Sequence, residues 1–118
     1  MQPDELARSI GTLESAATEG ALLASDVARD RTKVTFARVH ARELGETVVH
    51  EAEKLNDAEA EPEGGVASKK VKAIDLADRI SAELGRIQIA PDSETEGRGA
   101  EENLNRLSEQ ARQLAEGL

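Results

Sequence analysis

The sequence predicts an all-α protein that folds as an up-down-up-down four-helix bundle. Apolar and small residues recur at spacings of three and four along most of the chain, which is the helical period. Two polar segments that contain Pro and Gly interrupt this pattern, and acidic residues begin the first and last helical stretches. Because 118 residues is the length of one domain, we expect a single domain over 1–118. Its predicted helices are about 3–29, 34–57, 66–88 and 100–117, and its predicted linkers are 58–65 and 91–99.

The first predicted helix begins at Pro3. Proline fits the first helical position, and Asp4 and Glu5 favour the positive end of the helix dipole. The apolar stripe of this helix comprises Leu6, Ile10, Leu13, Ala17, Gly20, Ala24 and Val27. The stripe resumes in the second predicted helix with Val34, Ala37, Ala41, Leu44, Val48, Ala52 and Leu55. Between the two, the expected apolar position falls on Asp30 or Arg31.

This break leaves two structures open for the first 57 residues. One is a single helix of about 55 residues, roughly 80 Å long, with two shorter helices packed on it. The other is a helical hairpin that turns at the polar segment 29–33. The lack of Gly and Pro in that segment opposes a turn. Its polarity and the poor helix formers Val34 and Thr35 favour one, with Thr32 or Thr35 as the second N-cap, so we predict the hairpin.

Two rows of small residues support the hairpin. The first row is Ala16, Gly20, Ala24 and Ala28, and the second is Ala37, Ala41 and Gly45. A turn near 32/33 places Ala28 opposite Ala37, Ala24 opposite Ala41, and Gly20 opposite Gly45. Small residues at a spacing of four let two helix backbones approach closely. We therefore expect the first two helices to be in close contact along these rows.

The second half of the chain contains two further predicted helices. An acidic segment with Pro62 and two glycines separates them from the first half. The third helix carries the stripe Val71, Ile74, Ala77, Ile80, Leu84 and Ile87, and it ends before Pro91. Segment 91–99 is predicted to be a polar linker because it contains Pro and two glycines. The last helix begins at Ala100 and carries Leu104, Leu107, Ala111 and Leu114.

The charge balance argues against several classes of partner. The 15 basic and 24 acidic residues give a formal net charge of -9, whereas nucleic acids and anionic membranes select cationic surfaces. No apolar run approaches the roughly 20 residues of a transmembrane helix. The chain has no cysteine, and its first residues lack the basic and apolar regions of a signal peptide. We expect a cytoplasmic protein that binds neither nucleic acid nor membrane.

The composition also predicts a thin core. Hydrophobic residues make up 38% of the chain and aromatic residues 1%, so Phe36 is the single aromatic side chain. We expect Phe36 in the core, where a lone aromatic residue usually lies. The rest of the core must come from Leu, Ile, Val and Ala. Small bundles of this kind often gain stability from a second subunit, and we therefore predict a homodimer.

No catalytic, cofactor or metal motif is recognisable. His40 and His50 are the two histidines, and neither follows a Glu by three residues as di-metal carboxylate bundles require. The serines and glycines form neither a nucleophile motif nor a phosphate-binding loop. Glu51 and Glu53 are two residues apart, so they lie on diverging helix faces and are unsuited to paired acid–base chemistry. We predict that the protein is not an enzyme and uses no cofactor or metal.

The main charge feature is a basic segment around the first turn. Residues 29–42 carry five basic side chains and one acid, whereas residues 43–63 carry eight acids and one lysine. The candidate partner-binding residues are Arg29, Arg31, Lys33, Arg38 and Arg42. We predict a non-enzymatic structural or protein–protein interaction module. The alternative is a binding module that uses this basic segment to dock an acidic protein or an anionic ligand, and a solvated face paired with local acids is the simpler interpretation of the charges.

Overall fold

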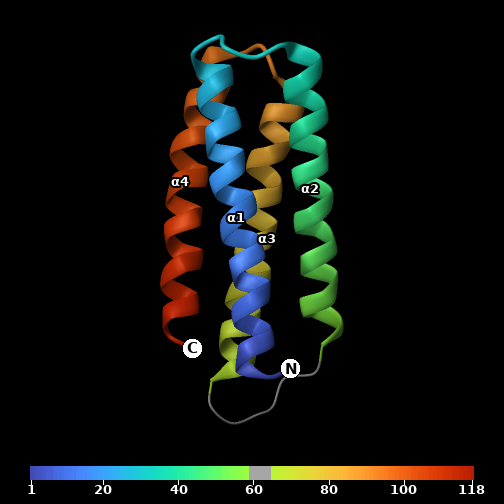
Figure 1. The fold of residues 1–118 in the computed structure, drawn as a ribbon, viewed down its shortest axis with the longest axis vertical. Helices are drawn as coiled ribbons and strands as arrows, with labels where there is room; N and C mark the ends of the chain where they lie inside the picture. Colours follow the sequence, from blue (N-terminus) through green and yellow to red (C-terminus); the bar gives the residue numbers. More distant parts are fainter. Residues whose placement is uncertain (59–64) are drawn as a thin grey trace.

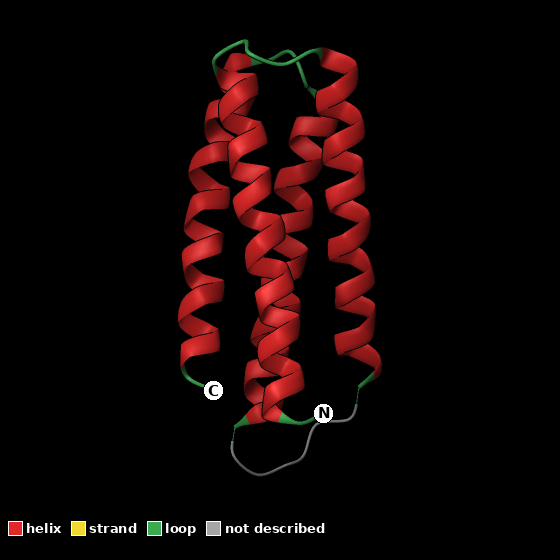
Figure 2. Ribbon diagram, in the orientation of Figure 1, coloured by secondary structure: helices red, strands yellow, loops and turns green. Residues whose placement is uncertain are grey.

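A computed structural model describes residues 1–58 and 65–118 and confirms the all-α four-helix bundle. Its helices are α1 (Pro3–Ala28), α2 (Val34–Asp57), α3 (Val66–Ile89) and α4 (Glu94–Glu116). They alternate in direction along a rod 48 Å long, with both termini at one end (Figure 1). Figure 2 shows helices as the sole regular structure in the described residues, with the α1–α2 and α3–α4 turns together at the other end. We call this the turn end.

The four helices do not pack evenly. α1 packs most extensively against α4, and α2 packs most extensively against α3. α1 also contacts α3 across the bundle, whereas α2 and α4 do not approach each other. α1 and α3 therefore each contact the other three helices, whereas α2 and α4 each contact two.

The core is aliphatic, as the composition predicts. Its largest fully buried side chains are Leu6, Ile10, Leu13, Val48, Leu55, Ile80, Leu84, Ile87 and Leu104. Val71 was expected among them but is 65% exposed. The buried residues in that part of α3 are Ala73 and Leu76, and Val71 points away from the face that they share.

The first 57 residues form two helices, so the alternative of one long helix is wrong. After Ala28, the Arg31 N–H donates a hydrogen bond of 2.8 Å to the carbonyl of Asp26. Asp30 adopts the left-handed conformation with φ 54°, the position that glycine usually fills after a helix. Asp tolerates this conformation better than most residues, which explains a turn without glycine. The N-cap of α2 is Lys33, without a side-chain cap, so the predicted Thr32 or Thr35 cap is also wrong.

α1 and α2 do pack against each other, but the predicted pairing of Gly20 with Gly45 is wrong. A Cβ built on Gly20 would lie 2.8 Å from Leu84 Cδ2 and 3.2 Å from Leu104 Cδ1, so Gly20 faces α3 and α4. Gly45 has no such neighbour within 4 Å. The α1 row instead packs against Gly97 of α4, where a Cβ would lie 2.7 Å from the Ala28 nitrogen. The spacing of small residues indicates that a helix packs closely against another, but it does not identify the other helix.

The predicted linker 91–99 is largely helical. α4 begins at Glu94, because the Ser93 hydroxyl oxygen accepts a hydrogen bond of 3.1 Å from the Glu96 N–H. Gly97 and Gly99, which suggested a loop, lie inside the helix. A Cβ on Gly97 would meet the α1 backbone, and a Cβ on Gly99 would lie 2.5 Å from Arg86 Nη2. These glycines therefore accommodate close contacts.

Candidate functional site

The five basic residues of the predicted partner-binding set do not form one patch. Arg29 turns toward α4, where its guanidinium lies 3.4 Å from the carboxylate of Glu101. Arg38 reaches the end of α3 and donates from Nε to the carbonyl of Gln88 at 3.5 Å. Both side chains connect neighbouring helices at the turn end, so part of their binding capacity is used within the chain.

The other three basic residues form no ion pair with another helix among the described residues. Arg42 forms an exposed pair with Glu46 one turn later, at 3.9 Å between Nε and Oε1. Arg31 and Lys33 lie exposed in the α1–α2 turn, and neither forms an ion pair within residues 1–58 and 65–118. These two charges are thus the part of the set that is available to an acidic partner.

Phe36 is 58% exposed, which contradicts its predicted place in the core. Its ring packs against His40, with ring centroids 5.4 Å apart and planes tilted by 59°. His40 Nε2 in turn lies 3.9 Å from the carboxylate of Glu19 on α1. The inward position at this level of α2 belongs to the fully buried Ala37, whose small side chain fills it. The aromatic ring is therefore left on the surface near the α1–α2 turn.

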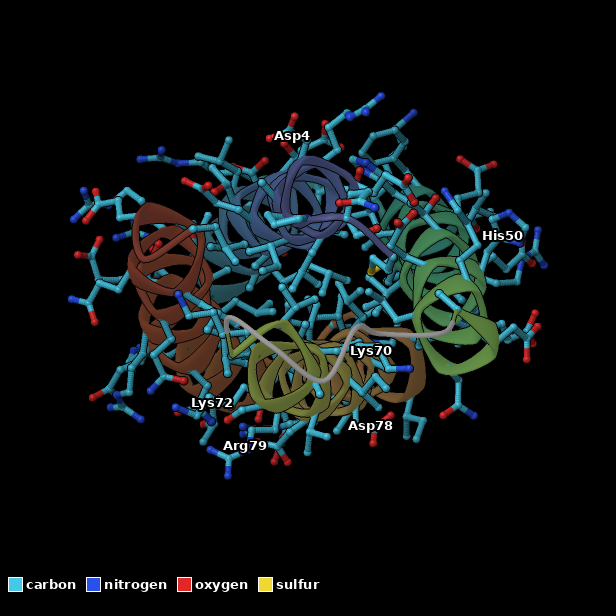
Figure 3. All side chains as sticks on the ribbon, turned by 90° about the horizontal axis from the view of Figure 1, so that it is seen from below. Asp4, His50, Lys70, Lys72, Asp78 and Arg79 are labelled. Carbon is cyan, nitrogen blue, oxygen red and sulfur yellow. The ribbon has the colours of Figure 1, made fainter. Side chains whose placement is uncertain are left out.

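A groove lies between α2 and α3. It consists of two adjoining cavities of about 500 Å³ and about 290 Å³ that share Val49, Glu53 and Ser81. In the end view of Figure 3, His50 marks the α2 side of this groove and Asp78 marks the α3 side. We call this feature the α2–α3 groove.

Two glycines shape the α2–α3 groove. Gly45 on α2 and Gly85 on α3 both line its larger cavity. A Cβ on either would have no neighbour within 4 Å, so packing within the monomer does not require glycine at these positions. Glycine inside a helix costs about 1 kcal/mol relative to alanine. This groove was not predicted from the sequence, and the signal that could have indicated it is glycine within predicted helices.

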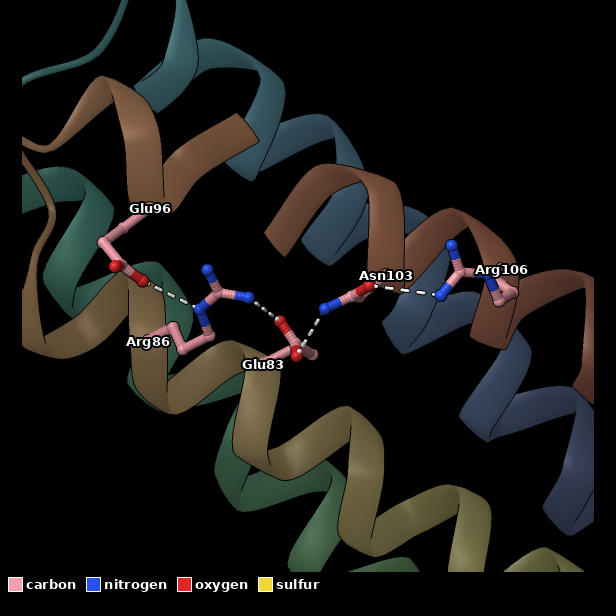
Figure 4. Close-up of polar contacts among 5 residues, drawn as sticks. All are labelled: Glu83, Arg86, Glu96, Asn103 and Arg106. Carbon is pink, nitrogen blue, oxygen red and sulfur yellow. Dashed lines mark hydrogen bonds and ion pairs between the residues drawn. The ribbon is translucent and has the colours of Figure 1, made fainter. Parts of the chain in front are cut away.

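The side between α3 and α4 carries a chain of polar contacts (Figure 4). Arg86 donates to Glu96 at 2.8 Å and to Glu83 at 3.0 Å, and Asn103 donates to Glu83 at 2.9 Å. The hydrogen bond to Glu96, followed by that to Glu83, raises the pKa of the Arg86 guanidinium above its ordinary value. Both carboxylates are engaged by cationic or amide donors that join the two helices. These hydrogen bonds hold α3 and α4 together, which is a structural role.

Glu51 and Glu53 point in different directions, as their spacing predicts. Glu51 is buried and lines a cavity of about 200 Å³ between α1 and α2, together with the buried Ser9. Its carboxylate lies 3.6 Å from Lys54 Nζ. Glu53 lines the α2–α3 groove on another face of the helix. The two carboxyl groups therefore do not share a site.

The described residues hold no group of three or more His, Cys, Asp or Glu side chains placed to bind a metal ion. Nor does any helix within 1–58 and 65–118 combine the length and apolar character needed to cross a bilayer. Comparisons with protein-family models, curated proteins and solved structures found no match. The candidate functional surfaces are therefore the α2–α3 groove and the turn end.

Proposed function

We propose that the protein is a non-enzymatic helical module that acts through protein–protein contacts and forms a homodimer. The observation that carries this proposal is the set of exposed apolar side chains on α2. This helix has neighbours on two sides only, and it carries three of the seven large exposed hydrophobic residues of the described chain. They are Val34, Phe36 and Val49. Exposed apolar and aromatic side chains beside polar ones are typical of contact surfaces.

The thin core supports the same proposal. The aromatic residue Phe36 contributes little to it, and many buried positions hold alanine, which buries little apolar area. Small domains bury a modest share of their surface on folding, so a dimer interface adds a useful share of the total stability.

Light scattering coupled to gel filtration tests the dimer. We expect a mass of twice the 12.6 kDa chain at micromolar concentration. We also expect a thermal midpoint that rises with protein concentration, because mass action links association to folding. A well-folded 12.6 kDa species with a midpoint independent of concentration would contradict the proposal.

A second candidate function rests on the turn end. Arg31 and Lys33 lack ion pairs among the described residues, and the exposed ring of Phe36 follows them closely in the chain. Arginine and aromatic side chains are enriched among the interface residues that contribute most of the binding energy. We propose that this surface docks an acidic protein, with Phe36 as its apolar anchor.

A capture experiment compares three forms of the protein. The Arg31→Ala/Lys33→Ala variant should lose an acidic partner that the wild type retains, while its helical circular dichroism stays unchanged. The control variant Lys72→Ala/Arg79→Ala removes two exposed cations from α3 and should retain the partner. Equal capture by all three forms would refute the docking role.

A further inference from the structure

We propose that the α2–α3 groove binds a cationic amphipathic helix of another protein, with the apolar face of that helix turned into the groove. This inference rests on the proposed role in protein–protein contacts and does not depend on the homodimer. Four features of the groove support it: its length, its apolar floor, its two glycines and the acidic residues along its rim.

The groove is long enough for about four turns of a helix. Its lining residues on α2 extend from Ala41 to Asn56, a stretch of about 22 Å at about 1.5 Å per residue. Those on α3 recur at the helical spacings of three and four, and they include Ile74, Ala77, Ser81, Leu84 and Gln88. The groove therefore runs along both helices rather than across them. A third helix can lie in such a groove and pack against α2 and α3 together.

The floor of the groove is apolar. Val48 of α2 and Leu84 of α3 line it, and both are fully buried by the bundle. Val49 lines both cavities and is 47% exposed, so about half of this aliphatic side chain is left for a partner to cover. Grooves with an apolar floor bind the apolar face of an amphipathic helix. The floor thus selects a partner with an apolar stripe.

Gly45 and Gly85 let the backbone of a partner come close. They line the larger cavity from opposite helices. A Cβ on either would meet no atom within 4 Å, so the monomer supplies no packing reason for glycine at these two positions. Helices that lack side chains at a contact approach each other closely. The larger cavity is therefore open to the backbone of a bound helix as well as to its side chains.

The rim of the groove is acidic at the end away from the turns. In the larger cavity, Arg42 pairs with Glu46, so these two charges offset each other. Glu53 lines both cavities, and Asp78 lines the smaller one from α3. Neither of these two acids forms an ion pair or a side-chain hydrogen bond among the described residues. His50 is the remaining titratable residue of the lining. Two unpaired carboxylates beside an apolar floor attract Lys or Arg of a partner.

The distribution of charge also favours a different protein over a second copy. A two-fold contact centred on Val49 would set Glu46 of one copy against Glu53 of the other, which places like charges together. Arg38 adds a positive charge near the turn end of the groove, where it donates to the carbonyl of Gln88. The basic residues of the bound helix therefore lie at its other end, beside the smaller cavity.

The first test compares two synthetic peptides of about 16 residues, or about four helical turns. One peptide has Leu and Ala on one helical face and Lys beside that face, and the other has Glu in place of every Lys. Fluorescence anisotropy should show that the wild-type protein binds the Lys peptide about tenfold or more tightly than the Glu peptide. Equal binding of the two peptides would overturn a cationic partner.

The second test fills the groove without changing its charge. Gly45→Gln and Gly85→Gln should each weaken binding of the Lys peptide by about tenfold or more, because each places a side chain where the partner's backbone lies. Gly11→Gln is the matched control on α1, where a Cβ also meets no atom within 4 Å, and it should leave the affinity unchanged. All three variants gain a better helix former, so each should keep its helical circular dichroism. Equal affinities of the three variants would overturn the groove as the site.

The third test removes the two free acids. Glu53→Gln/Asp78→Asn should weaken binding of the Lys peptide by about fivefold or more and reduce its dependence on salt. The control Asp4→Asn/Glu102→Gln removes the same charge from exposed positions of α1 and α4 and should change the affinity by less than about twofold. Figure 3 shows Asp4 on the α1 side, away from Asp78. Equal losses in both variants would show that net charge attracts the peptide, and would overturn the proposal.

The outcomes separate this inference from the proposed function. A protein that dimerises but does not bind the Lys peptide would overturn the inference and leave the homodimer standing. A monomer that binds the peptide through the groove would overturn the homodimer and support the inference. If Gly45→Gln weakened self-association and left peptide binding unchanged, a second copy would occupy the groove, which would overturn the cationic helix.

Discussion

The backbone nitrogen of Ala28 lies 2.7 Å from the position that a Cβ on Gly97 would occupy. The carbonyl oxygen of Ala24 lies 3.0 Å from the same position. Since both are backbone atoms, they cannot move aside as a flexible side chain would. Gly97 therefore allows α1 and α4 to form the most extensive helix pair of the bundle.

Gly97→Ala should destabilise the fold by about 1 to 3 kcal/mol, because the added methyl group forces the α1 and α4 backbones apart. Gly11→Ala is the matched control on α1, since a Cβ there meets no atom within 4 Å. That change should stabilise the fold by up to about 1 kcal/mol through helix propensity. Urea denaturation at one protein concentration measures both values. Equal effects of the two substitutions would contradict the close approach at Gly97.

Asp30→Gly should stabilise the α1–α2 turn. Asp30 has φ 54°, a conformation that glycine adopts without steric cost and alanine does not. Asp30→Ala removes the same charge but keeps a Cβ, so it isolates the backbone effect. We expect the Gly variant to exceed the Ala variant by about 1 kcal/mol in free energy of unfolding. If the Ala variant were equally stable, the left-handed conformation would not limit this turn.

Arg86→Ala should cost about 1 to 2 kcal/mol, because it removes two charged hydrogen bonds and leaves the carboxylate of Glu83 largely buried without its cation. Arg86→Lys should recover part of this loss, since a single ammonium cannot reproduce the geometry of the guanidinium. The control Arg79→Ala breaks an exposed pair with Asp75 and should cost about 0.5 kcal/mol or less. Thermal and urea unfolding of the three variants test the ranking.

The carboxyl group of Glu109 should titrate below the ordinary glutamate range. A hydrogen bond from Arg112 lowers its pKa in the folded state. A lowered folded-state pKa means that the pair contributes stability above the unfolded pKa and loses it as the pH falls through the folded value. Carbon NMR of the side-chain carboxyl measures this pKa directly. Arg112→Ala should raise it, whereas Arg106→Ala, whose partner is Glu102, should not.

Parts of the candidate site could be predicted from the sequence, and parts could not. The basic segment 29–42 was visible as a run of charges, but the separation of Arg29 and Arg38 from Arg31 and Lys33 was not. That separation depends on Glu101 and the Gln88 carbonyl, which come from helices distant in the sequence. Phe36 is exposed because Ala37 takes the inward position that the helical spacing predicts, whereas the expectation of a buried Phe36 rested on its residue type alone.

The number, type and order of the helices follow from local signals in the chain. Apolar spacing and the polar turn at 29–33 predict them, because these features act over a few residues. Which helix lies closest to which was decided in three dimensions. The row of small residues in α1 met Gly97 rather than Gly45, and two glycines that resembled a linker belong to α4. A spacing of small residues indicates that a helix makes a close contact. Which helix it contacts depends on how all four helices pack, because the native packing minimises voids and backbone overlap throughout the core.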